Sequence, residues 1–120
     1  MPRVLIVDDE ETIRMLLVEE FELEDWEALF AEDGEAAREL LSKNTFDLVI
    51  SDIRMPRMSG VELLKLIRES YSGLPCFLIT GYTDTANEVL RSARPDALFT
   101  KPFDFEVIFA AAKKAVGSAE

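Results

Sequence analysis

Five side chains that could bind a metal ion or take part in group transfer stand at or just beyond the ends of short apolar runs. They are Asp8 and Asp9 after residues 4–7, Asp52 after residues 48–51, Thr80 after residues 76–79 and Lys101 after residues 97–100. Three carboxylates that meet at one place repel one another unless a cation lies among them. Mg²⁺ is the expected cation, because it prefers oxygen ligands and commonly combines carboxylates with water and phosphate.

The charges of this set favour the transfer of a phosphoryl group. Three carboxylates, one Mg²⁺ and the Lys101 ammonium balance to zero, so an incoming phosphoryl group would meet a neutral site. Asp52 is the candidate nucleophile, and the metal and Lys101 could stabilise charge on the transferring oxygens. The Thr80 hydroxyl could donate to one of these oxygens. Each residue alone could be a turn, a cap or a solvated side chain, so the prediction rests on their coincidence at strand ends.

Short apolar runs alternate with longer amphipathic stretches five times along the chain. The expected strands are residues 4–7, 26–30, 48–51, 76–79 and 97–100. Three of them are unbroken apolar runs, as expected for strands buried on both faces of a parallel sheet. Right-handed crossovers distribute helices over both faces, so the pattern predicts an α/β, (βα)₅ doubly wound fold. Ligands bind at the carboxyl ends of the strands in such sheets, where the five side chains stand.

Apolar residues at helical spacing predict the helices between these strands. The first helix carries Ile13, Leu16, Leu17 and Phe21 as its core stripe, and the second follows a cap at Asp33. The third opens with a capping box from Ser59 to Glu62. A weaker helix is expected at residues 85–93. The last follows an Asp104 cap and runs through Val107, Ile108, Ala111 and Ala115 to a stop near Gly117.

Length and composition indicate one globular domain over residues 1–120, with 48% hydrophobic residues and a formal charge of −11. Such a charge argues against direct binding to nucleic acid or to an anionic membrane. The sequence has no apolar run of membrane-spanning length and no signal peptide, so a cytoplasmic location is expected. It also has no histidine, which leaves carboxylates, hydroxyls and lysine for any chemistry. The single cysteine, Cys76, is expected in the core.

Four segments resemble the receiver domains of bacterial two-component response regulators, and the resemblance covers essentially the whole chain. The segments are Val4-Leu-Ile-Val-Asp-Asp-Glu10, Asp47-Leu-Val-Ile-Ser-Asp-Ile-Arg-Met-Pro56 with Met58-Ser-Gly60, Leu78-Ile-Thr-Gly81, and Thr100-Lys-Pro-Phe103. The resemblance implies a flavodoxin-like sheet with strand order 2-1-3-4-5. It also implies a phosphoacceptor switch that is not an enzyme in the ordinary sense.

The resemblance assigns a role to each site residue. Asp52 corresponds to the phosphoacceptor, Asp8 and Asp9 to the acidic metal pocket that binds Mg²⁺ or Mn²⁺, and Arg54 to the residue whose backbone carbonyl completes the metal coordination. Thr80 corresponds to the switch hydroxyl and Lys101 to the phosphate-contacting lysine. Arg54 and Tyr82 would flank the phosphoryl group and slow its hydrolysis. Where receivers usually carry an aromatic residue that moves with the threonine, this chain has Leu98.

The expected partners are a sensor histidine kinase or phosphotransfer protein, an output domain or partner protein, and a second copy in a phosphorylation-dependent homodimer. The surface around Thr80 and Leu98 would change on phosphorylation. The chain is expected to be either a stand-alone receiver or the front of a longer regulator.

Other classes of protein share parts of this pattern. A haloacid-dehalogenase-type phosphatase uses similar residues, but there the nucleophile comes first and the acidic pair last. A flavodoxin needs a hydroxyl- and glycine-rich phosphate loop where this chain has residues 8–11, all acidic. The alternative that stays open is a receiver-like interaction module that works by binding alone, without phosphate.

Overall fold

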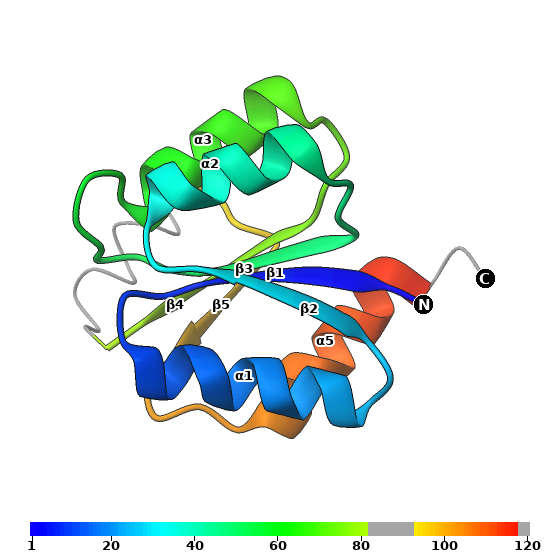
Figure 1. The fold of residues 1–120 in the computed structure, drawn as a ribbon. Coiled ribbons are helices and arrows are strands. Elements are labelled where there is room, and N and C mark those ends of the chain that lie inside the picture. The colour runs from blue at the N-terminus through cyan, green and yellow to red at the C-terminus, as the bar shows by residue number, and fades with distance from the viewer. Residues whose placement is uncertain (82–92, 118–120) are drawn as a thin grey trace.

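Five parallel strands and the helices packed on them make up the computed structural model, which describes residues 1–81 and 93–117. The elements are β1 (Arg3–Val7), α1 (Glu11–Leu23), β2 (Glu27–Ala31), α2 (Gly34–Lys43), β3 (Leu48–Asp52), α3 (Gly60–Ser70), β4 (Cys76–Thr80), β5 (Ala97–Thr100) and α5 (Phe105–Gly117). The strand order is β2-β1-β3-β4-β5, with every pair parallel, as predicted. In Figure 1, α2 and α3 cover one face of the sheet, and α1 and α5 cover the other.

The sheet divides the core into two apolar layers because neighbouring side chains of a strand point to opposite faces. In β1, Leu5 and Val7 pack with residues of α2 and α3, whereas Val4 and Ile6 pack with residues of α1 and α5. All residues of β3 and β4 are buried, whereas β2 and β5 at the edges are partly exposed. The unbroken apolar runs are therefore the central strands, as the sequence indicated.

The predicted helix caps are confirmed. Asp33 precedes α2, and its Oδ1 accepts a hydrogen bond from the Ala36 amide at 2.9 Å. At the start of α3, Ser59 and Glu62 form the reciprocal capping box, with hydrogen bonds of 3.2 and 3.0 Å. Asp104 accepts from the Glu106 amide at 2.9 Å in the first turn of α5. These polar side chains satisfy amides that have no partner within their helices.

Some sequence predictions were wrong in detail. Trp26 precedes β2 and does not belong to it, because its amide donates to the Phe21 carbonyl at the end of α1. Leu16 and Val107 were expected in the core but are 44% and 56% exposed. Each lies at the margin of the apolar stripe of its helix, about 100° around the axis from a buried neighbour, Leu17 or Ile108, and the sheet covers that neighbour instead.

The predicted helix at residues 85–93 lies, apart from its last residue, outside the described part of the chain. Within the described residues, none of the helices has the length and apolar character needed to cross a lipid bilayer.

Candidate functional site

The predicted site residues gather at one edge of the sheet because the strands are parallel and in register. Asp8 directly follows β1, Asp52 ends β3, Thr80 ends β4 and Lys101 directly follows β5. The register places Val7 beside Ser51, Asp52 beside Ile79, and Thr80 beside Thr100. The strand order reverses between β1 and β3, so this edge is also where a doubly wound sheet opens a crevice.

Asp52 lies at the centre of this edge and is 7% exposed. Its Oδ1 accepts a hydrogen bond from the Ile53 amide at 3.0 Å, and its Oδ2 lies 3.6 Å from Lys101 Nζ. The backbone carbonyl of Asp52 accepts from the Ser51 hydroxyl at 2.8 Å. One carboxylate oxygen is therefore held by the backbone, and the other is directed towards the lysine.

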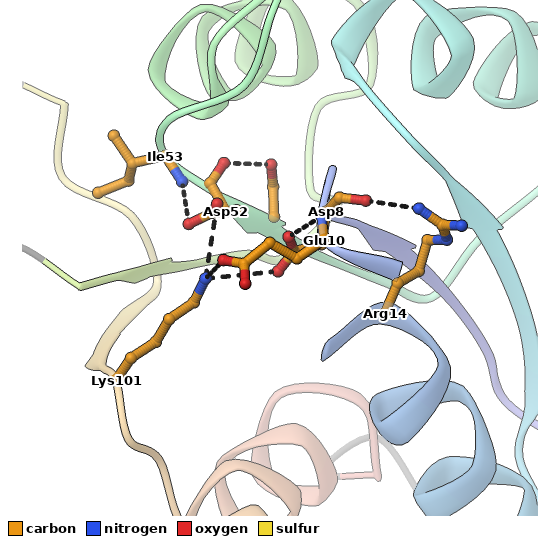
Figure 2. A network of polar contacts seen from close by, with 7 residues as sticks. Asp8, Glu10, Arg14, Asp52, Ile53 and Lys101 are labelled. Carbon is orange, nitrogen blue, oxygen red and sulfur yellow. Dashed lines mark hydrogen bonds and ion pairs between the residues drawn. The ribbon is translucent and has the colours of Figure 1, made fainter. Parts of the chain in front are cut away.

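Lys101 joins the acidic residues of the site, as Figure 2 shows. Its Nζ lies 3.1 Å from Glu10 Oε1, 3.6 Å from Asp52 Oδ2 and 3.7 Å from Asp8 Oδ2. The backbone amide of Lys101 donates to the Thr80 carbonyl at 2.8 Å, which extends the pairing of β5 with β4. The Lys101–Pro102 peptide bond is cis. Lys101 thus stands between the acidic cluster and the end of β4.

Three carboxylates meet closely enough to hold a cation. Oxygens of Asp8, Glu10 and Asp52 lie within 4.8 Å of one another. Asp8 is 1% exposed, and its Oδ1 accepts from the Glu10 amide at 2.9 Å. Its backbone carbonyl accepts from Arg14 of α1 at 3.0 Å, which fixes the turn after β1. A small group of anionic oxygens is the donor set that fits a hard divalent cation such as Mg²⁺.

Sequence reasoning missed Glu10 and placed Asp9 in the metal pocket. In the structure, Asp9 is exposed and lines the site cavity, but it does not belong to the close group of three carboxylates. The signal for Glu10 was the unbroken acidic run from residue 8 to residue 11, in which spacing alone could not say which side chains point inward. The role of Asp9 as a metal ligand stays a prediction.

Burial makes the charged form of Asp52 costly. Desolvation, with a further contribution from the charge of Asp8, raises the pKa of Asp52 to about 6, although Lys101 acts in the opposite direction. Burial likewise raises the pKa of Asp8. For Lys101, burial opposes the charged form, but the hydrogen bond to Glu10 and the negative charges of Asp8 and Asp52 raise its pKa overall. The site therefore holds more negative charge than its lysine neutralises, which favours a cation.

A cavity of about 470 Å³ opens over this edge, lined by Asp9, Glu10, Asp52, Arg54, Thr80, Gly81 and Lys101. Thr80 is buried, and Arg54 is exposed in the loop after β3. The structure therefore brings Asp8, Asp52, Thr80 and Lys101 together, with Asp9 and Arg54 at the rim. Tyr82 lies outside the described residues.

Gly60 allows the start of α3 to lie directly against the backbone of Asp52. A Cβ atom at residue 60 would lie 2.9 Å from Ile53 Cα, 3.0 Å from the Asp52 carbonyl carbon, and closer still to the Asp52 carbonyl oxygen. The Gly60 amide also donates to the Ile53 carbonyl at 2.9 Å. The absence of a side chain at residue 60 thus helps to hold Asp52 in place.

Leu98 and Phe99 point to opposite faces of β5. Leu98 packs against the layer that contains α2 and α3, whereas Phe99 packs in the layer of α1 and α5, with its ring 5.7 Å from that of Phe77. Phe99 therefore cannot take the place of an aromatic side chain at residue 98, because adjacent strand residues face opposite ways.

Comparison with known proteins agrees with this geometry. Residues 4–113 match the family model described as the response regulator receiver domain. The chain is 40% identical over 106 residues to regulatory protein AtoC of Escherichia coli, covering 87% of this chain and 23% of that protein. It is 35% identical to sporulation initiation phosphotransferase F of Bacillus subtilis, covering 93% of this chain and 91% of that protein.

The crystal structure of the response regulator TrrA from Thermotoga maritima, in complex with Mg²⁺–BeF, superposes with a TM-score of 0.88 at 38% identity. The match covers 96% of this chain and 99% of that one. The chain spans about a quarter of the length of the first regulators that it matches, and nearly all of phosphotransferase F.

Proposed function

Because the chain belongs to the family of response regulator receiver domains, we propose that residues 1–120 form one such domain and accept a phosphoryl group on Asp52. The observation that carries the proposal is the convergence of Lys101, Asp8 and Glu10 on a buried carboxylate at the end of the central strand. Receiver domains act in phosphorelay signalling as phosphoacceptor switches.

In this proposal Oδ2 of Asp52, the oxygen that faces Lys101, attacks phosphorus in a phosphohistidine or a small phosphodonor. The P–N or P–O bond to the donor breaks, and an acyl phosphate forms on Asp52. Asp8, Asp9, Asp52 and the backbone carbonyl of Arg54 would hold Mg²⁺, or Mn²⁺ in its place, and Glu10 could add a carboxylate oxygen. The ion supplies positive charge beside the transferring oxygens. Lys101 neutralises a further oxygen, and Thr80 donates its hydroxyl to another.

Several finer proposals follow from family membership. The donor would be a histidine kinase or phosphotransfer protein in the cytoplasm, and the surface around Thr80 and Leu98 would signal to an output domain, a partner protein or a second copy. With Leu98 in place of an aromatic residue, backbone movement would carry most of that signal. The formal charge of −11 speaks against nucleic acid and membranes as direct partners.

The decisive experiment is phosphorylation by acetyl phosphate, followed by intact mass. We expect the wild type to gain one phosphoryl group in Mg²⁺ or Mn²⁺ and none in EDTA, and Asp52→Asn to gain none. Equal labelling of the two proteins would reject Asp52 as the acceptor. If the wild type takes no phosphate in either metal, the phosphate-independent interaction module becomes the better explanation.

Two variants separate metal binding from phosphate contact. Asp9→Asn should weaken Mg²⁺ binding severalfold, because a hard cation depends on anionic oxygens. Lys101→Ala should leave Mg²⁺ binding intact and slow phosphorylation. Titration calorimetry with Mg²⁺ and the rate of labelling measure the two effects independently. Unchanged Mg²⁺ affinity in Asp9→Asn would remove Asp9 from the pocket.

A further inference from the structure

The loop between β3 and α3, residues 53–59, carries Arg54 and is fastened to the rest of the molecule at two places. At its C-terminal end, the Gly60 amide donates to the Ile53 carbonyl, and α3 begins directly against Asp52. At Met58, the loop packs on the start of α2, where a Cβ atom on Gly34 would lie 2.5 Å from Met58 Cβ and 2.6 Å from the Met58 carbonyl oxygen. The first contact fixes the phosphoacceptor, and the second fixes the loop.

Arg57 forms the polar part of the second contact. Its Nε donates to Asp33 Oδ2 at 2.9 Å, and its Nη2 donates to the same oxygen. The other oxygen of Asp33 caps α2, and the carboxylate is only 2% exposed. The hydrogen bonds from the Ala36 amide and from Arg57 lower the pKa of Asp33, so the carboxylate stays charged. A buried, capped carboxylate is a rigid anchor for the arginine.

The backbone of Arg57 is in the left-handed region, with φ of 67°. A side chain is strained in this conformation, and glycine would adopt it freely. An arginine at this turn is therefore unfavourable for the local backbone, and the contact with Asp33 compensates for it. This arrangement indicates that the anchor, and not the turn alone, determines the position of the loop.

We propose that Arg57 is a positioning residue for the metal site. Through Asp33 it holds the loop in the place from which Arg54 contributes to Mg²⁺ coordination, and so it sets the affinity for the ion. The inference rests on the proposed function, because it takes the Arg54 carbonyl as a metal ligand. Neither Asp33 nor Arg57 is among the residues that line the site cavity.

Simple electrostatics predicts the opposite effect, which makes the inference testable. Arg57 is a cation on a chain of charge −11, so its removal should strengthen the binding of Mg²⁺ if charge alone matters. If Arg57 acts as an anchor, its removal should weaken binding, because a ligand held less firmly binds its metal less well.

The experiment compares Mg²⁺ affinity by titration calorimetry in the wild type, Arg57→Gly and Arg38→Ala. Glycine removes the side chain and adopts the left-handed backbone conformation of residue 57 without strain, so Arg57→Gly is expected to fold. The midpoint of its urea denaturation without Mg²⁺ checks this. Arg38 pairs with Glu35 on the exposed surface of α2, so its removal deletes the same charge without loosening the loop. We expect the Kd of Arg57→Gly to rise about threefold to tenfold and that of Arg38→Ala to stay level or fall.

A second measurement separates positioning from general damage. At saturating Mg²⁺ the phosphorylation rate of Arg57→Gly should return to that of the wild type, since the loop is then held by the ion. Asp33→Asn keeps an oxygen that can cap α2 but weakens the contact with Arg57. The double variant Asp33→Asn/Arg57→Gly should therefore lose little more Mg²⁺ affinity than Arg57→Gly alone, because both changes remove the same contact.

The outcomes distinguish the two proposals. If the wild type binds no Mg²⁺ and takes no phosphate, the proposed function fails, and the role of Arg57 fails with it. If the wild type binds Mg²⁺ and Arg57→Gly binds it equally well or more tightly, the proposed function stands and Arg57 is not an anchor. A phosphorylation rate that stays low at saturating Mg²⁺ would also reject the positioning role.

Discussion

Replacing the proposed phosphoacceptor should make the metal-free protein more stable. Asp52 carries a charge that is buried beside Asp8, and its pKa is raised from 3.8 to about 6. At about 1.4 kcal/mol per pKa unit, this shift corresponds to a cost of about 3 kcal/mol for holding the charged form in the folded state. Asp52→Asn removes the charge with little change of shape. We therefore expect the free energy of unfolding to rise by about 3 kcal/mol at pH 7.

The difference in stability between Asp52→Asn and the wild type should increase with pH. The pKa of Asp52 is higher in the folded state than in the unfolded state, so the folded state binds the proton more tightly between these two values. The wild type should therefore lose stability relative to Asp52→Asn as the pH rises from about 4 to 6, with the full difference above pH 6. Near pH 3.5 the two proteins should be about equally stable. Saturating Mg²⁺ should reduce the difference at pH 7, because the ion binds the wild-type carboxylate in the folded state.

Urea denaturation in EDTA, followed through the buried side chain of Trp26, measures these differences. Asp33→Asn is the matched control, since Asp33 is also buried but its pKa is lowered by its hydrogen bonds. That variant should be destabilised at pH 7, and its deficit should shrink as the pH falls. If Asp52→Asn proves less stable than the wild type at pH 7 without metal, the contacts with Lys101 and Ile53 outweigh desolvation and the reasoning is refuted.

Gly60→Ala should lose about 1–3 kcal/mol of stability, despite the better helix propensity of alanine, because its Cβ would overlap the backbone of Asp52 and Ile53. The rate of phosphorylation of Gly60→Ala should also fall. Gly73→Ala is the control, because Gly73 has a φ of 88° and open space around it. This variant should lose about 1 kcal/mol of stability and keep the wild-type rate of phosphorylation. Cys76, whose pKa burial raises to about 12, should resist a thiol reagent at pH 8 until urea unfolds the protein, and rapid native labelling would contradict its burial.

The sheet could be predicted from the sequence because its signals are local. Leu48 to Ile50 and Cys76 to Ile79 are apolar without interruption, and such runs are typical of central parallel strands. The Ser59 and Glu62 capping box and the Asp33 cap depend on residues within one turn of each other, and both are confirmed. The exposure of Leu16 could not be predicted so well, because a wide apolar stripe does not say which of its margins the sheet will cover.

The sequence predicted which residues stand at the strand ends of the site, but not how the side chains of the neighbouring loops pair. Because all strands are parallel, their carboxyl ends bring Asp8, Asp52, Thr80 and Lys101 to one edge of the sheet. The pairing of Lys101 with Glu10 depends instead on the direction of side chains in a loop. Arg57 gave no signal at all, because its partner lies 24 residues away on another strand-to-helix connection. Contacts of this kind depend on tertiary packing, which no local pattern encodes.

Two of the buried aspartates, Asp33 and Asp52, differ in how far the surrounding groups compensate their charge. Asp33 receives hydrogen bonds from an amide and an arginine, so its charge stabilises the connection that it caps. From the described residues, Asp52 receives one amide hydrogen bond and a lysine contact at 3.6 Å, beside a second buried carboxylate, so these contacts leave its charge undercompensated. A carboxylate in the first state has little to gain from a new ligand. A carboxylate such as that of Asp52 is stabilised by binding a cation and can then accept a phosphoryl group. Until the ion binds, the apolar layers of the sheet supply the stability that keeps the Asp52 carboxylate buried.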